Sequence, residues 1–355
     1  MTANMDVLKR GADIGENFFR MKICEQDLAV CFGQYGINKK IKNWHILADG
    51  PDHPVPYEVI RLIIYAELED ETDKYVVKYV REPVFTTEII ENQCAFSNLL
   101  RDNGIRTPFR LKANGHYCTS YTKNGLRMDV TIEEWVGEKP EHMTMDLFEQ
   151  VGRTLGKSHR VSLEHGPEIG YSLLYDEVTT KDTSYERIWK TTRHDFISPT
   201  DLKQILSLYE KRINIIKKNW TKLPRAAVQG DIYSCNNFTV RNGTLVMFDF
   251  NLAGDEVLIG DMLLCWFRTI FDENMQEDLK NIRREDLWLR FIQAYQKERP
   301  FTEIEKQYLA DAYALFGTLY YTKLLVYYVQ TGQKLKAAER YRDTIRLLNV
   351  LEVPI

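Results

Sequence analysis

The chain is poor in cysteine, and the six cysteines among its 355 residues are scattered along the sequence. No two of them form a C-x-x-C pair, which excludes the spacings that most zinc-binding cysteines use. Scattered cysteines without such pairs are typical of reduced thiols in an intracellular protein. We therefore expect neither a cysteine-based zinc site nor a framework of disulfide bonds.

The sequence also lacks a long apolar run. One of the longest late in the chain, residues 324–329, is far shorter than the roughly twenty apolar residues that span a bilayer. Charged side chains recur through the first twenty residues, so the apolar core of a secretory signal peptide is missing there. We expect a cytoplasmic protein without a membrane partner.

Positive charge is not in excess, because 47 lysines and arginines stand against 51 aspartates and glutamates and give a net charge of −4. This balance argues against a nucleic-acid-binding protein that relies on bulk charge. The content of 44% apolar and 28% charged residues is ordinary for a globular protein. A chain of this length can form two domains, or one two-lobed fold with a core in each lobe.

The first part of the chain has the pattern of an antiparallel β-meander. Residues 44–47, 57–68 and 74–80 are rich in β-branched and aromatic side chains, and turn-forming residues separate them. Lys78 interrupts the apolar pattern of the third run. Lys78 either points to solvent through the alternation of a strand or contacts a phosphate group, which requires an acidic partner to hold it.

A helix follows the meander and supplies acidic candidates for that partner. We predict that it begins after Thr87 as its N-cap and runs to about residue 102. Glu88 and Glu91 lie three residues apart and therefore share one face of this helix. Either of them could pair with Lys78, and either could equally be a solvated acid that the helix dipole favours in the first turn.

Further strand-like runs lead to a boundary in the middle of the chain. They lie near residues 110–113, 116–122 and 128–136, and a glycine and a proline follow the last one. We predict an α+β protein with two lobes. The lobe of residues 1–138 is β-rich, with one main helix and an N-terminal helical extension, and the lobe of residues 139–355 is mostly helical. The helices predicted in the second lobe begin near residue 144 and continue at residues 198–219, 262–271, 284–297, 303–330 and 335–350.

Residues 228–261 combine a predicted hairpin with several polar residues. An Asn-Gly pair at residues 242–243 separates two short apolar runs, which is the strongest short-range signal for a hairpin. A hairpin brings its two ends together, so Asn236 and Asp249 should lie close to each other, with Asp231 just before them. Such a cluster of carboxylate and amide oxygens suits Mg²⁺ beside the phosphates of a nucleotide.

With these parts in this order, the chain resembles the aminoglycoside phosphotransferase and choline kinase family, the small-molecule branch of the protein-kinase-like fold. The catalytic loop of this family reads H-G-D-x-x-x-x-N, and residues 229–236 read Q-G-D-I-Y-S-C-N, so three of the four fixed positions match. The resemblance covers roughly residues 46–295. It implies a bilobal fold with a β-rich N-terminal lobe and a mostly helical C-terminal lobe that carries a catalytic hairpin.

The resemblance also implies roles for the polar residues of the hairpin segment. Asp231 would be the catalytic aspartate, which orients the acceptor hydroxyl group and accepts its proton. Asn236 would hold Mg²⁺ together with Asp249, which opens the segment equivalent to D-F-G in protein kinases. Asp261 would brace the catalytic loop through backbone hydrogen bonds.

The same resemblance places ATP against the N-terminal lobe. Lys78 would contact the α- and β-phosphates, with Glu91 or Glu88 as its acidic partner. The hinge segment, whose backbone would pair with adenine, comprises Glu134, Trp135 and Val136.

Two features of the sequence depart from the family pattern, and a third matches it. Gln229 replaces the usual histidine, and since that histidine organises the loop without transferring a proton, we expect glutamine to substitute by hydrogen bonding. Residues 49–56, at the place of the loop that covers the nucleotide, contain one glycine and three prolines and no G-x-G-x-x-G. His159 resembles the histidine that ends a family helix, and a packing role is expected for it.

The predicted function is ATP-dependent phosphoryl transfer to a hydroxyl group of a small molecule such as an aminoglycoside, choline or homoserine. The alternative is a non-catalytic nucleotide-binding pseudokinase or scaffold, which Gln229 and residues 49–56 would suit. Acidic residues between positions 272 and 286 barely favour a cationic acceptor, because most charge runs are solvated faces. The sequence indicates no nucleic-acid partner and carries no signal for the oligomeric state.

Overall fold

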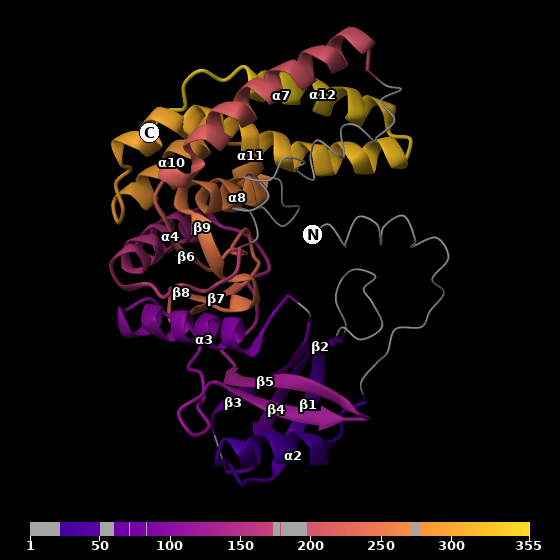
Figure 1. Ribbon diagram of the computed structural model, residues 1–355, viewed down its shortest axis with the longest axis vertical. Coiled ribbons are helices and arrows are strands. Elements are labelled where there is room, and N and C mark those ends of the chain that lie inside the picture. The colour runs from indigo at the N-terminus through magenta and orange to yellow at the C-terminus, as the bar shows by residue number, and fades with distance from the viewer. Residues whose placement is uncertain are drawn as a thin grey trace. The chain divides into compact units, whose positions relative to one another are not determined.

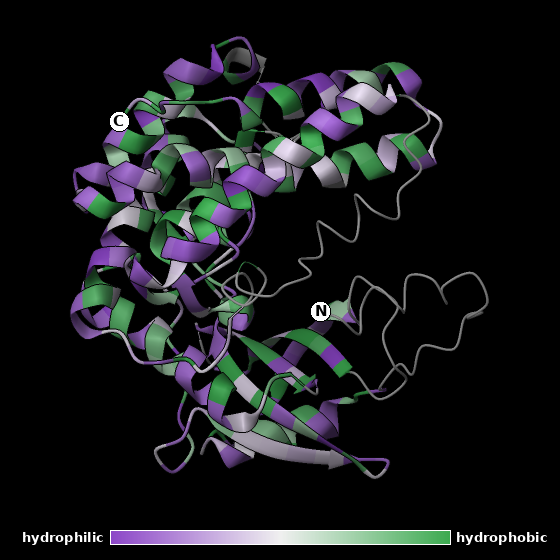
Figure 2. Ribbon diagram, turned by 45° about the horizontal axis from the view of Figure 1, so that its top comes forward, coloured by the Kyte–Doolittle hydropathy of each residue, from purple (hydrophilic) through white to green (hydrophobic). Residues whose placement is uncertain are grey.

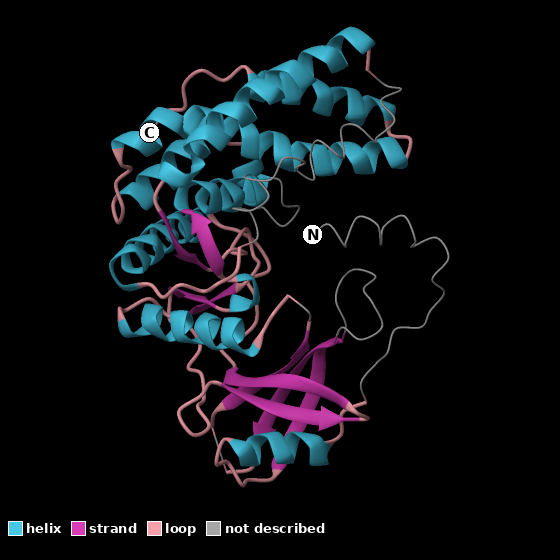
Figure 3. Ribbon diagram, viewed as in Figure 1, coloured by secondary structure: helices cyan, strands magenta, loops and turns pink. Residues whose placement is uncertain are grey.

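The computed structural model describes residues 22–49, 60–70, 72–82, 84–172, 178, 197–270 and 277–355. Contacts between residues divide the chain into an N-terminal unit, Met1–Glu138, and a C-terminal unit, Lys139–Ile355. The N-terminal unit is built on an antiparallel sheet, and the C-terminal unit is mostly helical (Figures 1 and 3). The predicted α+β class is therefore confirmed.

The sheet of the N-terminal unit has the strand order β1-β2-β3-β5-β4, and all neighbouring strands are antiparallel. Its strands are β1 (Ile41–Asp49), β2 (Ile60–Leu68), β3 (Lys74–Arg81), β4 (Cys118–Lys123) and β5 (Leu126–Glu134). The predicted meander corresponds to β1, β2 and β3. Two predictions are wrong: residues 110–113 form only isolated bridges, and the last strand ends at Glu134 instead of residue 136.

One face of this sheet is covered by α2 (Glu25–Gln34). Alternate residues of β3, among them Tyr75 and Val77, belong to the same apolar cluster as Phe32 of α2. Because side chains alternate along a strand, Lys78 points to the opposite face. Lys78 lies on the middle strand and is only 3% exposed, so the alternative that it points to solvent is wrong.

The main helix of the N-terminal unit is α3 (Thr87–Asp102). Its N-cap is Thr86, whose hydroxyl group accepts a hydrogen bond from the N–H group of Ile89. The sequence therefore placed the cap one residue too late. Glu88 in the first turn is exposed and Glu91 is half-buried, so the two acids on this face differ in their surroundings.

The long helices of the C-terminal unit begin and end close to their predicted positions. They are α4 (Met145–His165), α7 (Pro199–Asn219), α8 (Leu258–Ile270), α10 (Arg284–Gln296), α11 (Glu303–Gln330) and α12 (Lys334–Leu348), with the shorter η1 (Trp220–Lys222), η2 (Phe250–Leu252) and α9 (Glu277–Lys280) between them. Ser198 caps α7, with Pro199 in its first turn, and Thr302 and Glu305 form the capping box of α11.

Two observations describe how these helices pack. A Cβ atom at Gly156 of α4 would lie 2.4 Å from the backbone oxygen of Tyr295 of α10, so only glycine allows this approach. Hydrophobic and hydrophilic residues alternate along the helices in Figure 2, as expected for helices with one buried face. None of the described helices is long and apolar enough to cross a membrane.

Two short antiparallel strand pairs lie between α7 and α8. The first joins β6 (Arg225–Val228) to β9 (Gly254–Val257), and the second joins β7 (Phe238–Arg241) to β8 (Thr244–Met247). The turn of the second pair has φ angles of 52° at Asn242 and 71° at Gly243. The predicted Asn-Gly hairpin is thus confirmed, whereas the pairing of β6 with β9 was not predicted.

Candidate active site

The loop that follows β6 begins with a backbone conformation that requires glycine. Gly230 has a φ angle of 81°, and a Cβ atom there would lie 2.6 Å from the backbone oxygen of Leu252. A residue with a side chain would be strained by the positive φ angle and would collide with the backbone that follows β8. Gly230 therefore lets the loop pass close to this backbone, with Asp231 as the next residue.

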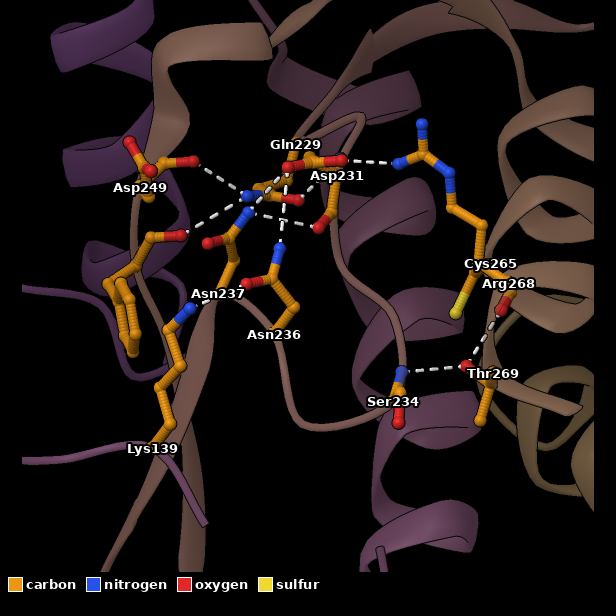
Figure 4. Close-up of polar contacts among 11 residues, drawn as sticks. Lys139, Gln229, Asp231, Ser234, Asn236, Asn237, Asp249, Cys265, Arg268 and Thr269 are labelled. Carbon is orange, nitrogen blue, oxygen red and sulfur yellow. Dashed lines mark hydrogen bonds and ion pairs between the residues drawn. The ribbon is translucent and has the colours of Figure 1, made fainter. Parts of the chain in front are cut away.

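Gln229 fastens this loop to the end of β8. Its Oε1 accepts a hydrogen bond of 2.8 Å from the N–H group of Asp231, and its Nε2 donates to the backbone oxygens of Phe248 (3.1 Å) and Asp249 (2.7 Å) (Figure 4). The side chain is buried, with 1% of Gln229 exposed. Glutamine thus links the two segments on which the sequence analysis placed the catalytic and metal-binding residues.

Both carboxylate oxygens of Asp231 have partners. Oδ2 accepts hydrogen bonds from Nδ2 of Asn237 at 2.7 Å and from Nδ2 of Asn236 at 3.5 Å. Oδ1 forms an ion pair with Nη1 of Arg268. Burial raises the pKa of Asp231 and the charge of Asp249 raises it further, while Arg268 and Asn237 oppose this rise. The influence of Asp249 on this pKa indicates that the two carboxylates lie within electrostatic range.

A tight turn carries the loop from Asp231 to Asn236. The N–H group of Asn236 donates to the backbone oxygen of Tyr233 at 2.8 Å, and Ser234 adopts a left-handed φ angle of 44°. The N–H group of Ser234 donates to Oγ1 of Thr269 at 2.8 Å. Since Thr269 lies in the last turn of α8, this bond attaches the loop to that helix (Figure 4).

Asn236 and Asp249 are the two residues predicted to hold a metal ion. Nδ2 of Asn236 faces Asp231, and its Oδ1 accepts a hydrogen bond of 2.6 Å from Nζ of Lys139. The amide oxygen therefore already faces a cation. Asp249 has a left-handed backbone (φ 56°, ψ 74°), an uncommon conformation for a non-glycine residue that is often found at functional sites.

The donor set of this pair fits the predicted magnesium ion only if phosphates complete its coordination. Mg²⁺ in such sites is held by one or two protein oxygens and completes its coordination with phosphates and water. The described residues contain no group of three or more His, Cys, Asp or Glu side chains that could hold a metal ion. An amide oxygen and one carboxylate thus suit a metal ion that arrives with phosphates, and do not form an all-protein cage.

In the N-terminal unit the structure pairs Lys78 with an acid that the sequence analysis did not consider. Nζ of Lys78 lies 3.0 Å from Oε1 of Glu133, and Nη2 of Arg110 lies 2.7 Å from the other oxygen of the same carboxylate. Glu133 is the diagonal neighbour of Lys78 across the β3–β5 pair, on the same face of the sheet. All three side chains are buried, so one carboxylate lies between two cations away from water.

The carboxylate of Glu91 accepts hydrogen bonds from the N–H groups of Tyr117 (3.0 Å) and Cys118 (2.8 Å). It thereby connects α3 to the start of β4. The pairing of Lys78 with Glu91 or Glu88 stays a prediction.

The predicted hinge segment is only partly available for pairing with a base. The N–H group of Glu134 donates to the backbone oxygen of Phe109 at 2.8 Å, and that of Trp135 donates to the backbone oxygen of Lys74 at 2.7 Å. Two of the three hinge N–H groups are therefore used within the N-terminal unit. Of the predicted covering loop, only Asp49 lies among the described residues.

His159 is fully buried in a polar chain inside the C-terminal unit. The carboxylate of Asp261 can only accept, so Nε2 of His159 carries the proton and donates to it at 3.0 Å. In the neutral ring Nδ1 then accepts at 2.8 Å from the hydroxyl group of Tyr295, which itself accepts from Arg299 at 2.9 Å. Burial lowers the pKa of His159. The expected packing role fits these contacts, and the bracing of the loop by Asp261 stays a prediction.

Four contacts of the candidate site involve residues that sequence reasoning missed. Asn237 holds Asp231 more closely than Asn236 does, and Arg268 pairs with Asp231 from a helix 37 residues later. The sequence analysis placed Lys139 and Glu133 only near the boundary that it predicted between the two lobes. The doubled asparagine at positions 236–237 was a usable signal for the first of these contacts, whereas the other three depend on tertiary structure.

Comparisons with known proteins show the fold. No protein-family model matches the sequence, and no curated protein does. Among solved structures, a microcompartment-associated aminopropanol kinase is 13% identical and matches with a TM-score of 0.58 over 90% of this chain and 96% of its own. An amicoumacin kinase in complex with AMP-PNP and Ca²⁺ is 15% identical, with a TM-score of 0.55 over 84% and 91%.

A spectinomycin phosphotransferase in complex with ADP and spectinomycin is also similar. It is 13% identical, with a TM-score of 0.54 over 92% of this chain and 98% of its own. At such low identities the similarity establishes the fold. The chain therefore has the protein-kinase-like fold in the form that small-molecule kinases and phosphotransferases share.

Proposed function

We propose that the protein is a kinase that transfers the γ-phosphoryl group of ATP to a hydroxyl group of a small molecule. The observation that carries this proposal is the surroundings of Asp231. Its carboxylate and backbone are held by Asn237, Asn236 and Gln229, and the charge of Asp249 acts on it. The complexes of similar proteins with AMP-PNP and with ADP support a nucleotide as phosphoryl donor.

In the proposed reaction Asp231 orients the acceptor hydroxyl group and takes its proton. The hydroxyl oxygen forms a bond to the γ-phosphorus, the bond from this phosphorus to the β,γ-bridging oxygen breaks, and ADP leaves. Burial raises the pKa of Asp231, which makes the carboxylate a better proton acceptor than an exposed aspartate. The hydrogen bond from Asn237 to Oδ2 fixes the rotation of the carboxylate.

The remaining roles divide between the two units. Asn236 and Asp249 of the C-terminal unit would hold Mg²⁺, which when bound neutralises charge on the phosphates. The N-terminal unit, residues 1–138, would bind the nucleotide. There Lys78, which Glu133 holds at 3.0 Å, would contact the α- and β-phosphates, and the segment Glu134–Val136 would pair with adenine. The C-terminal unit, residues 139–355, would carry the acceptor site.

The alternative, a non-catalytic nucleotide-binding scaffold, rested on Gln229 and on residues 49–56, of which only Asp49 lies among the described residues. The three hydrogen bonds of the Gln229 side chain weaken that argument, because they supply the loop-organising contacts that are expected of the histidine it replaces. The intact set of Asp231, Asn236 and Asp249 favours catalysis.

A two-step experiment tests the proposal. The first step measures the thermal shift of the full-length protein with MgATP, for the wild type and for Asp249→Asn, which should lose the metal-dependent part of the shift. The second step measures ADP formation across a panel of amino alcohols, hydroxy acids, sugars and aminoglycosides. Binding of MgATP without turnover of any acceptor would favour the scaffold, and acceptor-dependent ADP formation would establish the kinase.

A further inference from the structure

The ion pair between Arg268 and Asp231 brings a fixed positive charge to the proposed catalytic carboxylate. Nη1 of Arg268 contacts Oδ1 of Asp231, and the two side chains are 20% and 21% exposed, so the pair is partly shielded from water (Figure 4). The proposed kinase reaction makes no use of this arginine. It also needs an acceptor hydroxyl group to reach the carboxylate beside this arginine.

The position of this guanidinium group is set by its surroundings. Its Cζ lies 4.9 Å from the centroid of the Tyr233 ring, so an aromatic face of the loop supports it. The next residue, Thr269, accepts the hydrogen bond from Ser234 of the same loop and donates to the backbone oxygen of Cys265 at 2.7 Å. These two hydrogen bonds hold the last turn of α8 against the loop. They thereby fix the position of Arg268, the residue before Thr269.

Among the described residues, Arg268 uses little of its hydrogen-bonding capacity. A guanidinium group has five N–H donors in a planar fork. Within the part of the chain that the structure describes, Asp231 is the only hydrogen-bond acceptor of this fork, through Nη1. The donors on Nε and Nη2 thus have no acceptor among those residues. A partly buried guanidinium whose remaining donors meet no acceptor in the described part of the chain, and which lies beside the proposed catalytic carboxylate, is suited to bind an oxyanion in a bidentate manner.

The charges around the reacting atoms point to the same class of ligand. Oδ2 of Asp231 already accepts two hydrogen bonds, from Asn237 and Asn236, whereas Oδ1 has Arg268 as its partner, so the carboxylate has more room for an acceptor hydroxyl at Oδ1, next to Arg268. An ammonium group close to that hydroxyl would be repelled by the guanidinium. A carboxylate or phosphate group would attract it, and would draw Nη1 away from Oδ1 as the hydroxyl group arrives.

We propose that Arg268 determines acceptor specificity by binding an oxyanion of the acceptor, so that the substrate is a hydroxylated carboxylate or phosphate ester. This inference rests on the proposed kinase function and names its substrate class. The acidic residues at positions 272–286 had slightly favoured a cationic acceptor, and this inference reverses that preference. Of these, Asp286 is on the surface, paired with Arg283 at 2.8 Å.

Two series of acceptors that share a skeleton and differ in charge test the proposal on the full-length protein. The three-carbon series comprises glycerate, glycerol 3-phosphate, glycerol and 3-aminopropane-1,2-diol. The four-carbon series comprises 4-hydroxybutanoate, 4-hydroxybutyl phosphate, butane-1,4-diol and 4-aminobutan-1-ol. ADP formation from MgATP gives kcat and KM for each compound. We expect kcat/KM to be at least about tenfold higher for an anionic member than for its neutral counterpart, with the cation lowest. Within each series, comparing kcat/KM of the carboxylate with that of the phosphate ester shows which oxyanion is preferred.

The variant Arg268→Gln distinguishes an arginine that binds the acceptor from one that only positions Asp231. The variant should raise KM for anionic acceptors about tenfold or more and leave KM for neutral ones unchanged, and Arg268→Lys should restore part of the difference. Arg290→Gln, which removes an arginine from an exposed pair with Glu149, serves as the matched control and should change neither value. Melting temperatures verify that all variants fold.

Two outcomes of the kinetic measurements would overturn the inference, and a third concerns the kinase function on which it rests. An equal fall in turnover for all acceptors in Arg268→Gln would show that the arginine only positions Asp231. A wild-type preference for neutral or cationic members would contradict the assigned class while leaving the kinase function intact. Absence of turnover with every acceptor would count against the kinase function itself. In that case binding of the same compounds in the presence of AMP-PNP, measured by calorimetry, must still favour the anions and depend on Arg268.

Discussion

Gln229 donates a hydrogen bond from Nε2 to the backbone oxygen of Asp249 at 2.7 Å. With its other end it accepts from the N–H group of Asp231 at 2.8 Å, so one buried amide spans the segments that carry the proposed base and the proposed metal ligand. The relative position of these two carboxylates therefore depends on a side chain that the sequence analysis counted as a departure from the family pattern.

Replacing this amide with an apolar side chain should disturb both stability and catalysis. Gln229→Leu leaves the buried N–H group of Asp231 without its acceptor, which should lower the free energy of unfolding by about 1–3 kcal/mol. A displaced Asp231 should lower kcat about 100-fold. Gln229→His is the matched variant and should retain most activity, because an imidazole can also donate and accept one hydrogen bond each. Equal kcat values for Gln229→Leu and the wild type would contradict this role.

The glycine before the proposed base should be irreplaceable. Gly230→Ala combines a positive φ angle with a Cβ atom 2.6 Å from the backbone oxygen of Leu252, and should lower the free energy of unfolding by about 3 kcal/mol. Gly243→Ala is the control, because its φ angle of 71° is similar but no atom lies within 4 Å of the added Cβ. This control should lose only about 1 kcal/mol. Urea unfolding measures both free energies. Equal losses in Gly230→Ala and Gly243→Ala would show that the backbone near Leu252 moves to accept the added Cβ atom.

Glu133 should matter more for stability than either of its cationic partners. Glu133→Gln leaves Lys78 and Arg110 buried without their shared carboxylate, which should lower the free energy of unfolding by about 3–5 kcal/mol. Lys78→Met leaves the pair of Glu133 and Arg110 intact and should destabilise less. The same variant should lower kcat/KM for MgATP about 100-fold if Lys78 contacts the phosphates. Unchanged kcat/KM in Lys78→Met would remove Lys78 from the nucleotide site.

The buried His159 should make stability depend on pH. Burial lowers its pKa in the folded protein below the unfolded value of about 6.5. Its contribution is therefore fully present above pH 6.5 and is lost as the pH falls, because the unfolded chain binds the proton more readily. Urea midpoints between pH 7.5 and 5 should decrease, and more steeply in the wild type than in His159→Gln. Parallel curves for the two proteins would contradict this assignment.

Local signals in the sequence predicted where helices, strands and turns lie better than they predicted which of these elements contact one another. The Asn242–Gly243 turn and the starts of α7 and α11, which Ser198 and Thr302 cap, depend on residues close in sequence, and the structure has them where they were predicted. The N-cap of α3 was misplaced because two threonines stand side by side, and only the hydrogen bond from Ile89 identifies Thr86.

The partners of the candidate site residues depend on tertiary structure, and these the sequence could not predict. Lys78 meets Glu133 because β3 and β5 pair in a particular register, which no local pattern encodes. Arg268 meets Asp231 where the last turn of α8 lies against the loop, a contact that also includes the Thr269–Ser234 hydrogen bond. Sequence motifs therefore indicated which residues are chemically suited to the site, and the packing of helices and strands determined which charges surround them.

The most direct test of the account measures two properties of Asp231→Asn beside the wild type. These are ADP formation with an accepted substrate and the thermal shift with MgATP. We expect kcat to fall by about 10²–10⁴-fold, since the proton acceptor is lost, while the MgATP shift is preserved. Arg290→Gln should match the wild type in both measurements. Wild-type turnover by Asp231→Asn would contradict the central claim that this carboxylate is the catalytic base.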